Sequence, residues 1–175
     1  STLLAQVDAN YQAYIEQYKD LAITEQERHA IPASITMAQA LLESSAGVSR
    51  LATIGNNHFG IKCGKDWTGD AMHHDDDQLG ECFRKYKKPI ESFEDHSLFL
   101  KRQRYAFLFQ YDITDYKAWA NGLSRAGYAT DPTYPEKLIK IIETYDLAKL
   151  DTKAKAVEPA EDAPNYEQLW GYIEI

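Results

Sequence analysis

The strongest constraint on the fold is a single interruption of helical periodicity, between positions 56 and about 88. On either side of it, apolar residues recur at steps of three and four, as they do on one face of an α-helix. Within the interruption glycine is frequent, and the fragments FGIK (59–62) and CFRKY (82–86) have strand-like composition. The sequence therefore predicts an α+β fold, mostly helical, with a small β-lobe inserted between helices.

Capping residues suggest where the helices begin and end. The first helix is expected over about the first thirty residues, and the second follows Pro32, which suits a first helical turn. After the β-lobe, Ser92 is expected to cap a third helix, and the next helix is expected to stop at Gly127. Asp131 as cap, with Pro132 in the first turn, then predicts the last long helix.

Chain length and composition favour one domain followed by a tail. We expect a domain over residues 1–150 and a linker or C-terminal tail over 151–175, because 153–164 is rich in Ala, Glu, Lys and Pro. The formal charge is −8, from 19 Lys and Arg against 27 Asp and Glu, which argues against nucleic acid as the main partner. No apolar run approaches the ~20 residues of a membrane span. We expect a monomer without cofactor or metal, and a secretory signal removed ahead of the first residue.

Glu43 is the first candidate for chemistry. It follows Leu41 and Leu42 on a mostly apolar helix, where desolvation should raise the pKa of its carboxyl group. A carboxyl group that stays protonated near neutral pH is what a general acid requires. The alternative is that Glu43 lies on a polar stripe or caps the turn that follows the helix.

The second candidate is the acidic run Asp75, Asp76 and Asp77, which follows two histidines. It is interpreted in three ways: an exposed acidic loop, a cation site, or the source of a second carboxylate opposite Glu43. The run lacks the glycine and glutamate spacing of a calcium loop. In a strand, Asp75 and Asp77 would share one face and Asp76 would lie on the other.

Two further clusters combine polar and aromatic groups. The first contains Asn57, His58 and Phe59 at the start of the β-lobe, and the second contains Tyr128 and Tyr134 around a predicted helix start. Amides and tyrosines are groups that would bind a sugar with N-acetyl substituents. Core packing and helix capping explain the same residues more simply.

Taken in order, these segments resemble a known family. The segments are ITMAQALLES (35–44), NNHFGIK (56–62), WTG (67–69), FRKY (83–86), SFEDH (92–96) and GYATDP (127–132). Together they resemble the peptidoglycan N-acetylglucosaminidases of glycoside hydrolase family 73. The amino-acid sequence of the segments is most similar to that of members of the Bacteroidetes type. The resemblance runs from about position 31 to 147.

The resemblance implies a lysozyme-like helical domain with a β-lobe beside a substrate groove. It also implies that the protein is a secreted, autolysin-like enzyme. Such an enzyme hydrolyses the β-1,4 bond after N-acetylglucosamine in cell-wall glycan strands. Glu43 matches the family's general acid, and Tyr128 its active-site tyrosine. The family's second carboxylate has no literal counterpart; Asp75, Asp76 and Asp77 stand at about its place. The alternative function is a catalytically inactive protein that binds cell-wall glycan.

Two cysteines complete the candidate residues. Cys63 follows the first strand-like fragment and Cys82 opens the second. If these fragments pair, the two sulfurs come within bonding reach, and a disulfide would indicate a periplasmic or extracellular location. Two buried free thiols are the alternative.

Overall fold

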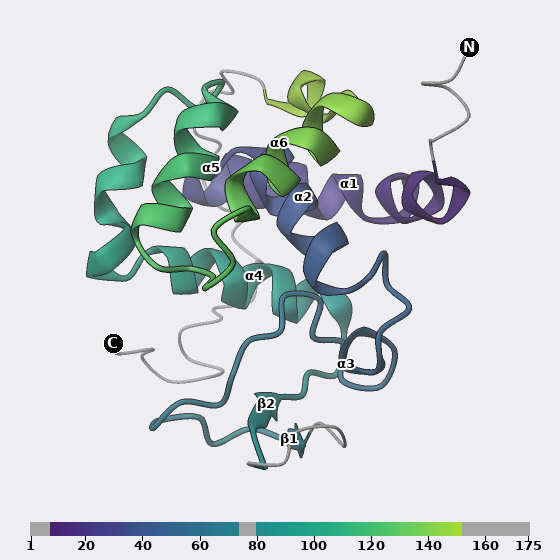
Figure 1. Ribbon diagram of the computed structural model, residues 1–175. Coiled ribbons are helices and arrows are strands. Elements are labelled where there is room, and N and C mark those ends of the chain that lie inside the picture. Colours follow the sequence, from purple (N-terminus) through teal and green to yellow (C-terminus); the bar gives the residue numbers. More distant parts are fainter. Residues whose placement is uncertain (1–7, 74–79, 152–175) are drawn as a thin grey trace.

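The computed structural model describes residues 8–73 and 80–151 (Figure 1). Its α-helices are α1 (Ala9–His29), α2 (Ala33–Glu43), α3 (Arg50–Thr53), α4 (Pro89–Leu100), α5 (Tyr116–Arg125) and α6 (Tyr134–Thr144). The 3₁₀ helices are η2 (Gln103–Gln110) and η3 (Leu147–Leu150), and the strands are β1 (Ala71–His73) and β2 (Cys82–Arg84). No described helix has both the length and the apolar character needed to cross a membrane. The predicted α+β class, mostly helical with a small β-lobe, is confirmed.

Helix α2 is the centre of the helical body. Residues 33–41 of it are all buried, and it packs against α1, α5, α6 and η3. A mostly apolar helix that is buried around its whole circumference needs other elements on all sides, which is the arrangement in Figure 1. The largest fully buried side chains include Ile35, Met37 and Leu41 of α2 itself and, from other elements, Trp119, Tyr105, Phe93, Leu138 and Ile142. This packing fixes the end of α2, where Glu43 lies.

The start of α4 differs from the sequence prediction. The helix begins at Pro89, not after Ser92, and the Ser92 hydroxyl donates to the Pro89 carbonyl at 2.9 Å inside the first turn. The Glu91 carboxylate accepts from the Lys87 amide at 2.7 Å. Proline in the first turn and an acidic side chain reaching back to free amides start the helix earlier than a serine cap would.

The start of α6 differs in a similar way. Asp131 does not cap the helix; its carboxylate accepts from the Thr133 amide at 2.8 Å in a local turn. The helix begins at Tyr134, and Pro135, rather than Pro132, occupies its first turn. The predicted stop of the preceding helix is confirmed, because α5 ends just before Gly127, which has a φ of +80°.

The β-lobe lies at one end of the helical body (Figure 1). Strands β1 and β2 are antiparallel, with Met72 opposite Phe83, and a further antiparallel bridge joins Lys62 to Phe83. The predicted pairing of the two strand-like fragments is therefore present. Cys63 and Cys82 lie side by side in this pairing, with Cα atoms 5.4 Å apart, and form a disulfide.

A buried polar cluster attaches the β-lobe to α4. The Arg84 guanidinium donates to the Asp95 carboxylate at 2.9 Å, and the Tyr86 hydroxyl also donates to it. Arg84 and Asp95 are both buried, so removing either would leave a charge without its partner. This cluster holds the lobe beside the helical body and so shapes the groove between them.

Candidate active site

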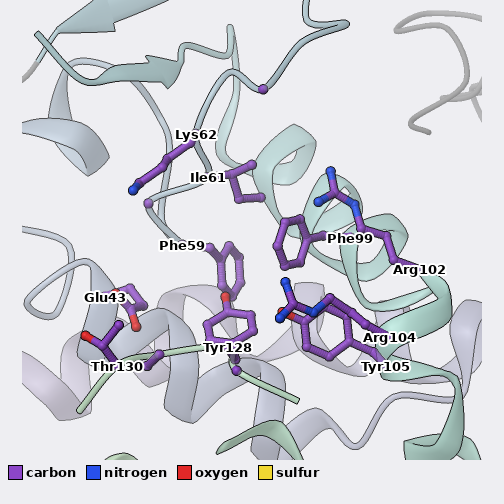
Figure 2. A pocket seen from close by; sticks show the side chains of 14 residues that line it. Glu43, Phe59, Ile61, Lys62, Phe99, Arg102, Arg104, Tyr105, Tyr128 and Thr130 are labelled. Atoms are coloured by element: carbon purple, nitrogen blue, oxygen red, sulfur yellow. The ribbon is translucent and has the colours of Figure 1, made fainter. Parts of the chain in front are cut away.

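A cleft of about 540 Å³ opens between the β-lobe and the helical body (Figure 2). Its described lining comes from the end of α2, the loop that begins the β-lobe, the α4–η2 region and the loop before α6. The lining residues are Glu43, Phe59, Gly60, Ile61, Lys62, Gly64, Phe99, Arg102, Arg104, Tyr105, Gly127, Tyr128, Ala129 and Thr130. Segments distant in sequence therefore form one concave surface.

Glu43 is the last residue of α2 and the only carboxylate among the described lining residues. The chain turns sharply after it: Gly47 has a φ of +83°, and its amide donates to the Ser44 hydroxyl at 2.8 Å. Burial raises the pKa of Glu43 above its usual value. The end of a helix, where backbone carbonyls point outward, also disfavours a carboxylate. The pKa shift therefore favours the protonated form that was expected from sequence.

A chain of buried side chains leads to Glu43. The His96 Nε2 and Gln39 Oε1 atoms are 2.8 Å apart, and the Gln39 Nε2 donates to the Tyr134 hydroxyl at 2.9 Å. An amide oxygen can only accept, so His96 must carry its proton on Nε2. Burial lowers the pKa of His96 to about 3, so the ring is neutral.

The direction of this chain is therefore fixed. His96 donates to Gln39 and Gln39 donates to Tyr134, which leaves the Tyr134 proton free to interact with Glu43. Hydrogen bonding from Tyr134 lowers the pKa of Glu43, against the larger effect of burial. Tyr134 was expected to touch substrate; it is buried and does not line the cleft, so the structure places it behind Glu43.

Tyr128 lies at the cleft surface, and aromatic rings support it. It stacks on Tyr134 with ring centroids 5.7 Å apart and contacts Phe99 edge-on at 5.9 Å. Phe59 also lines the cleft, and its ring stacks on His96 at 4.0 Å. Figure 2 shows Phe59 and Tyr128 together beside Glu43, so the structure brings these three predicted residues to one site.

Asn57 and His58 do not line the cleft. The Asn57 side chain is buried and donates to the Ile61 and Arg84 carbonyls at 3.0 and 2.9 Å, so it shapes the β-lobe. His58 is buried beside α1, with its Nδ1 2.7 Å from the Tyr14 hydroxyl. Both were expected to bind substrate; their placement instead assigns them to the loop that carries Phe59.

Asp75, Asp76 and Asp77 lie outside the described residues. Their expected role as second carboxylate therefore rests on the sequence.

The cationic and aromatic side of the cleft was not among the features predicted from the sequence. Arg102, Arg104 and Tyr105 line it from the start of η2, together with Phe99 at the end of α4. The signal was present in the segment FLKRQRY (99–105), which is basic and aromatic within an acidic chain. Nothing in the spacing of this segment indicates which of its side chains reach a groove.

Comparisons with known proteins agree with this geometry. Residues 19–147 match the Glucosaminidase family model, described as mannosyl-glycoprotein endo-beta-N-acetylglucosaminidase. The exo-glucosaminidase LytG of Bacillus subtilis is 36% identical over 152 residues, covering 80% of this chain and 53% of that protein. The peptidoglycan hydrolase FlgJ of Vibrio parahaemolyticus is 32% identical over 142 residues, covering 74% and 46%. The chain thus spans about half the length of these relatives.

Solved structures show the same fold. The catalytic domain of the autolysin Auto from Listeria monocytogenes has a TM-score of 0.69 at 28% identity, covering 83% of this chain and 90% of that chain. A peptidoglycan hydrolase from Sphingomonas sp. A1 has a TM-score of 0.68 at 29% identity, covering 82% and 97%. With a family match over most of its length and this fold, the chain belongs to the glucosaminidase family, glycoside hydrolase family 73.

Proposed function

We propose that this protein hydrolyses the β-1,4 bond after N-acetylglucosamine in peptidoglycan glycan strands, with Glu43 as the general acid. One observation carries the proposal: in a glucosaminidase domain, Glu43 is the carboxyl group of the described cleft lining, and burial raises its pKa. The names of the relatives, an exo-glucosaminidase and a peptidoglycan hydrolase, support this substrate.

The geometry suggests how the bond is broken. The protonated Glu43 carboxyl donates its proton to the glycosidic oxygen, so that the departing sugar leaves as a neutral alcohol. The Tyr134 hydroxyl then donates to the newly formed carboxylate and stabilises it, since the Tyr134 oxygen already accepts from Gln39. Tyr128 contacts the sugar from the cleft surface, where neighbouring rings fix its orientation.

A second carboxylate is needed if an enzyme group activates water, attacks the sugar, or orients the substrate's own N-acetyl group. We assign it to one of Asp75, Asp76 and Asp77, because the described cleft lining supplies no acid besides Glu43. Asp→Asn substitutions made one at a time should affect the rate unequally, with one change far more damaging than the others. Equal and mild effects would reject the assignment.

We place the reaction outside the cytoplasm, in the periplasm or at the cell surface. The Cys63–Cys82 disulfide supports this location, because such bonds persist in oxidising compartments. The relatives include a protein named autolysin, from Enterococcus faecalis. Counting thiols in denatured, unreduced protein tests the bond: no reactive thiol is expected, and two would contradict it.

Mass spectrometry of the digestion products tests the function itself. Purified sacculi are digested, and the released fragments are reduced with borohydride to mark the new reducing end. Fragments ending in reduced N-acetylglucosamine are expected, and the Glu43→Gln protein should release none above background. Fragments ending in reduced N-acetylmuramic acid would show cleavage of the other bond. Binding to sacculi without any release would instead favour the inactive glycan-binding alternative.

A further inference from the structure

The cleft carries a charge opposite to that of the whole chain. The protein has a formal charge of −8, yet the described cleft lining contains Lys62, Arg102 and Arg104 against the single acid Glu43. In Figure 2 the two arginines lie on the side away from Glu43, with Phe59 and Tyr128 between them. A groove lined by one sign of charge attracts a ligand of the other sign.

Arg102 is held in place by an aromatic ring rather than by an acid. Its Cζ lies over the Phe99 ring, 4.2 Å from the ring centroid, in a cation–π contact. Its Nε is buried and has no hydrogen-bond partner within the described residues. The Asp95 carboxylate is near enough to interact electrostatically with Arg102, but its Oδ2 accepts from Arg84 and Tyr86, and its Oδ1 has no hydrogen-bond partner within the described residues. Arg102 therefore has donor capacity that the described fold does not use.

Arg104 owes its position to a glycine. A Cβ atom placed on Gly127 would lie 2.9 Å from the Arg104 Nη2, so the absent side chain makes room for the guanidinium beside Tyr128. Among residues 8–73 and 80–151, no carboxylate forms an ion pair with either Arg102 or Arg104. Lys62 differs, because it pairs with Glu81.

We infer that Arg102 and Arg104 form a subsite for a carboxylate carried by the muramic acid units of the strand. The inference rests on the proposed function. N-acetylglucosamine is neutral, so it offers a guanidinium no charged partner. Muramic acid carries a lactyl group, which is a free carboxylate in strands stripped of peptide. In intact strands that group is amide-linked, and the carboxylates belong to the peptide stem. An arginine side chain binds a carboxylate with two parallel hydrogen bonds.

The experiment measures binding in the Glu43→Gln background, so that it does not depend on turnover. Arg102→Gln, Arg104→Gln and the double variant are titrated against soluble, uncross-linked strands with a fluorescent label. The strands are used intact, stripped of stems by an amidase, or with their carboxylates converted to amides. Arg125→Gln is the matched control, because Arg125 is an exposed arginine of α5 that does not line the cleft.

Each arginine variant should weaken binding of charged strands about ten-fold, as expected for the loss of a charged hydrogen-bonding partner. Amidated strands should bind the parent protein as weakly as charged strands bind the double variant, and Arg125→Gln should change nothing. Stripped strands that keep full affinity would identify the lactyl carboxylate as the ligand, and stripped strands that lose it would identify the stem.

Equal affinity of the parent and double variants for charged strands would overturn the inference, as would equal affinity of the parent for charged and amidated strands. Thermal unfolding of each variant separates lost binding from lost folding. If a variant unfolds early, Arg102→Lys and Arg104→Lys keep the charge and should recover part of the affinity. Failure of the proposed function would be seen in a different experiment, the digestion of sacculi, as absence of cleavage by the unsubstituted protein.

Discussion

Glu43 and Glu25 are both glutamates whose pKa is raised by burial, but their surroundings differ. Glu43 opens onto the cleft. Glu25 lies between α1 and α4, fully buried, and accepts from the Ser97 hydroxyl at 2.7 Å. Burial and the adjacent Glu94 raise the pKa of Glu25 to about 9. The comparison shows that a raised pKa marks burial first, and marks chemistry only where the group also faces a space that a substrate can enter.

The Glu25 site is a closed ion cluster. Glu94 lies 2.8 Å from the His29 Nε2 and 3.5 Å from the Arg28 guanidinium, and these interactions lower its pKa despite burial. A protonated Glu25 can donate to the ionised Glu94. Glu25, His29 and Glu94 are also close enough to hold a metal ion, but the Arg28 cation beside them disfavours one. We therefore expect Glu25 to contribute to stability and Glu43, the proposed general acid, to contribute to turnover.

The largest effect should follow from Glu43→Gln. Glutamine keeps the shape of the side chain but cannot donate a proton, so the rate of fragment release should fall by ~10²–10⁴. The melting temperature should stay close to that of the unsubstituted protein, because Glu43 is not fully buried. Near-normal clearing of sacculi by this variant would reject Glu43 as the acid.

Glu94→Ala should show the reverse pattern. It removes the carboxylate nearest to His29 and Arg28 and leaves Glu25 3.7 Å from His29, and the free energy of unfolding should drop by about 3 kcal/mol. Activity per folded molecule should be unchanged, because Glu94 lies outside the cleft lining. Urea denaturation and the rate at low temperature measure the two quantities. Glu136→Ala, on the exposed side of α6, is the control and should change stability by less than ~0.5 kcal/mol.

Tyr134→Phe should shift the pH profile of the reaction. A general acid works in its protonated form, so activity is lost as pH rises through the pKa of Glu43. The Tyr134 hydroxyl lowers that pKa, so its removal should move the loss of activity to higher pH. The maximal rate should fall less than about ten-fold, the scale of one hydrogen bond. If the alkaline limb of the pH–activity profile were unchanged, the Tyr134 hydroxyl would have no effect on the pKa of Glu43.

Glu25→Gln should leave activity unchanged and should be seen only in the pH dependence of stability. The pKa of Glu25 is about 9 in the folded state and lower when unfolded, so its contribution is complete below about pH 4.3 and declines as pH rises toward 9. Glutamine mimics the protonated form and should remove this decline. Unfolding free energies at pH 5, 6.5 and 8 should therefore vary less in the variant. The same slope in both proteins would mean that Glu25 is ionised in the folded state.

Sequence patterns predicted what depends on local chemistry. Helical periodicity identified α2, and its apolar character explained why Glu43 would be desolvated. The helix starts at Ser92 and Asp131 were wrong because competing signals, Pro89 with Glu91 and Pro135, lay within a few residues. In such cases the sequence offers several caps, and tertiary packing selects one.

What the sequence could not predict depends on side-chain direction. Asn57 and His58 adjoin Phe59 in the chain, yet only Phe59 lines the cleft. Their polar side chains suggested sugar binding. In the structure Asn57 donates to backbone carbonyls, and His58 forms a hydrogen bond with the Tyr14 hydroxyl. Arg102 and Arg104 were missed for the opposite reason, since a basic residue in a helical region is ordinarily solvent-exposed.

The burial of α2 has a consequence for protein motion. Because nine consecutive residues of this helix are inaccessible to water, its amide hydrogens can exchange with solvent only when the whole domain unfolds. Arg104 belongs to the 3₁₀ helix η2 and Arg102 is the residue that precedes it; both have exposed neighbours, and the hydrogen bonds of a 3₁₀ helix have poorer geometry than those of an α-helix. Glu43, the proposed proton donor, therefore ends a helix that we expect to exchange slowly, whereas the two arginines proposed to bind a carboxylate lie in a segment that we expect to exchange faster.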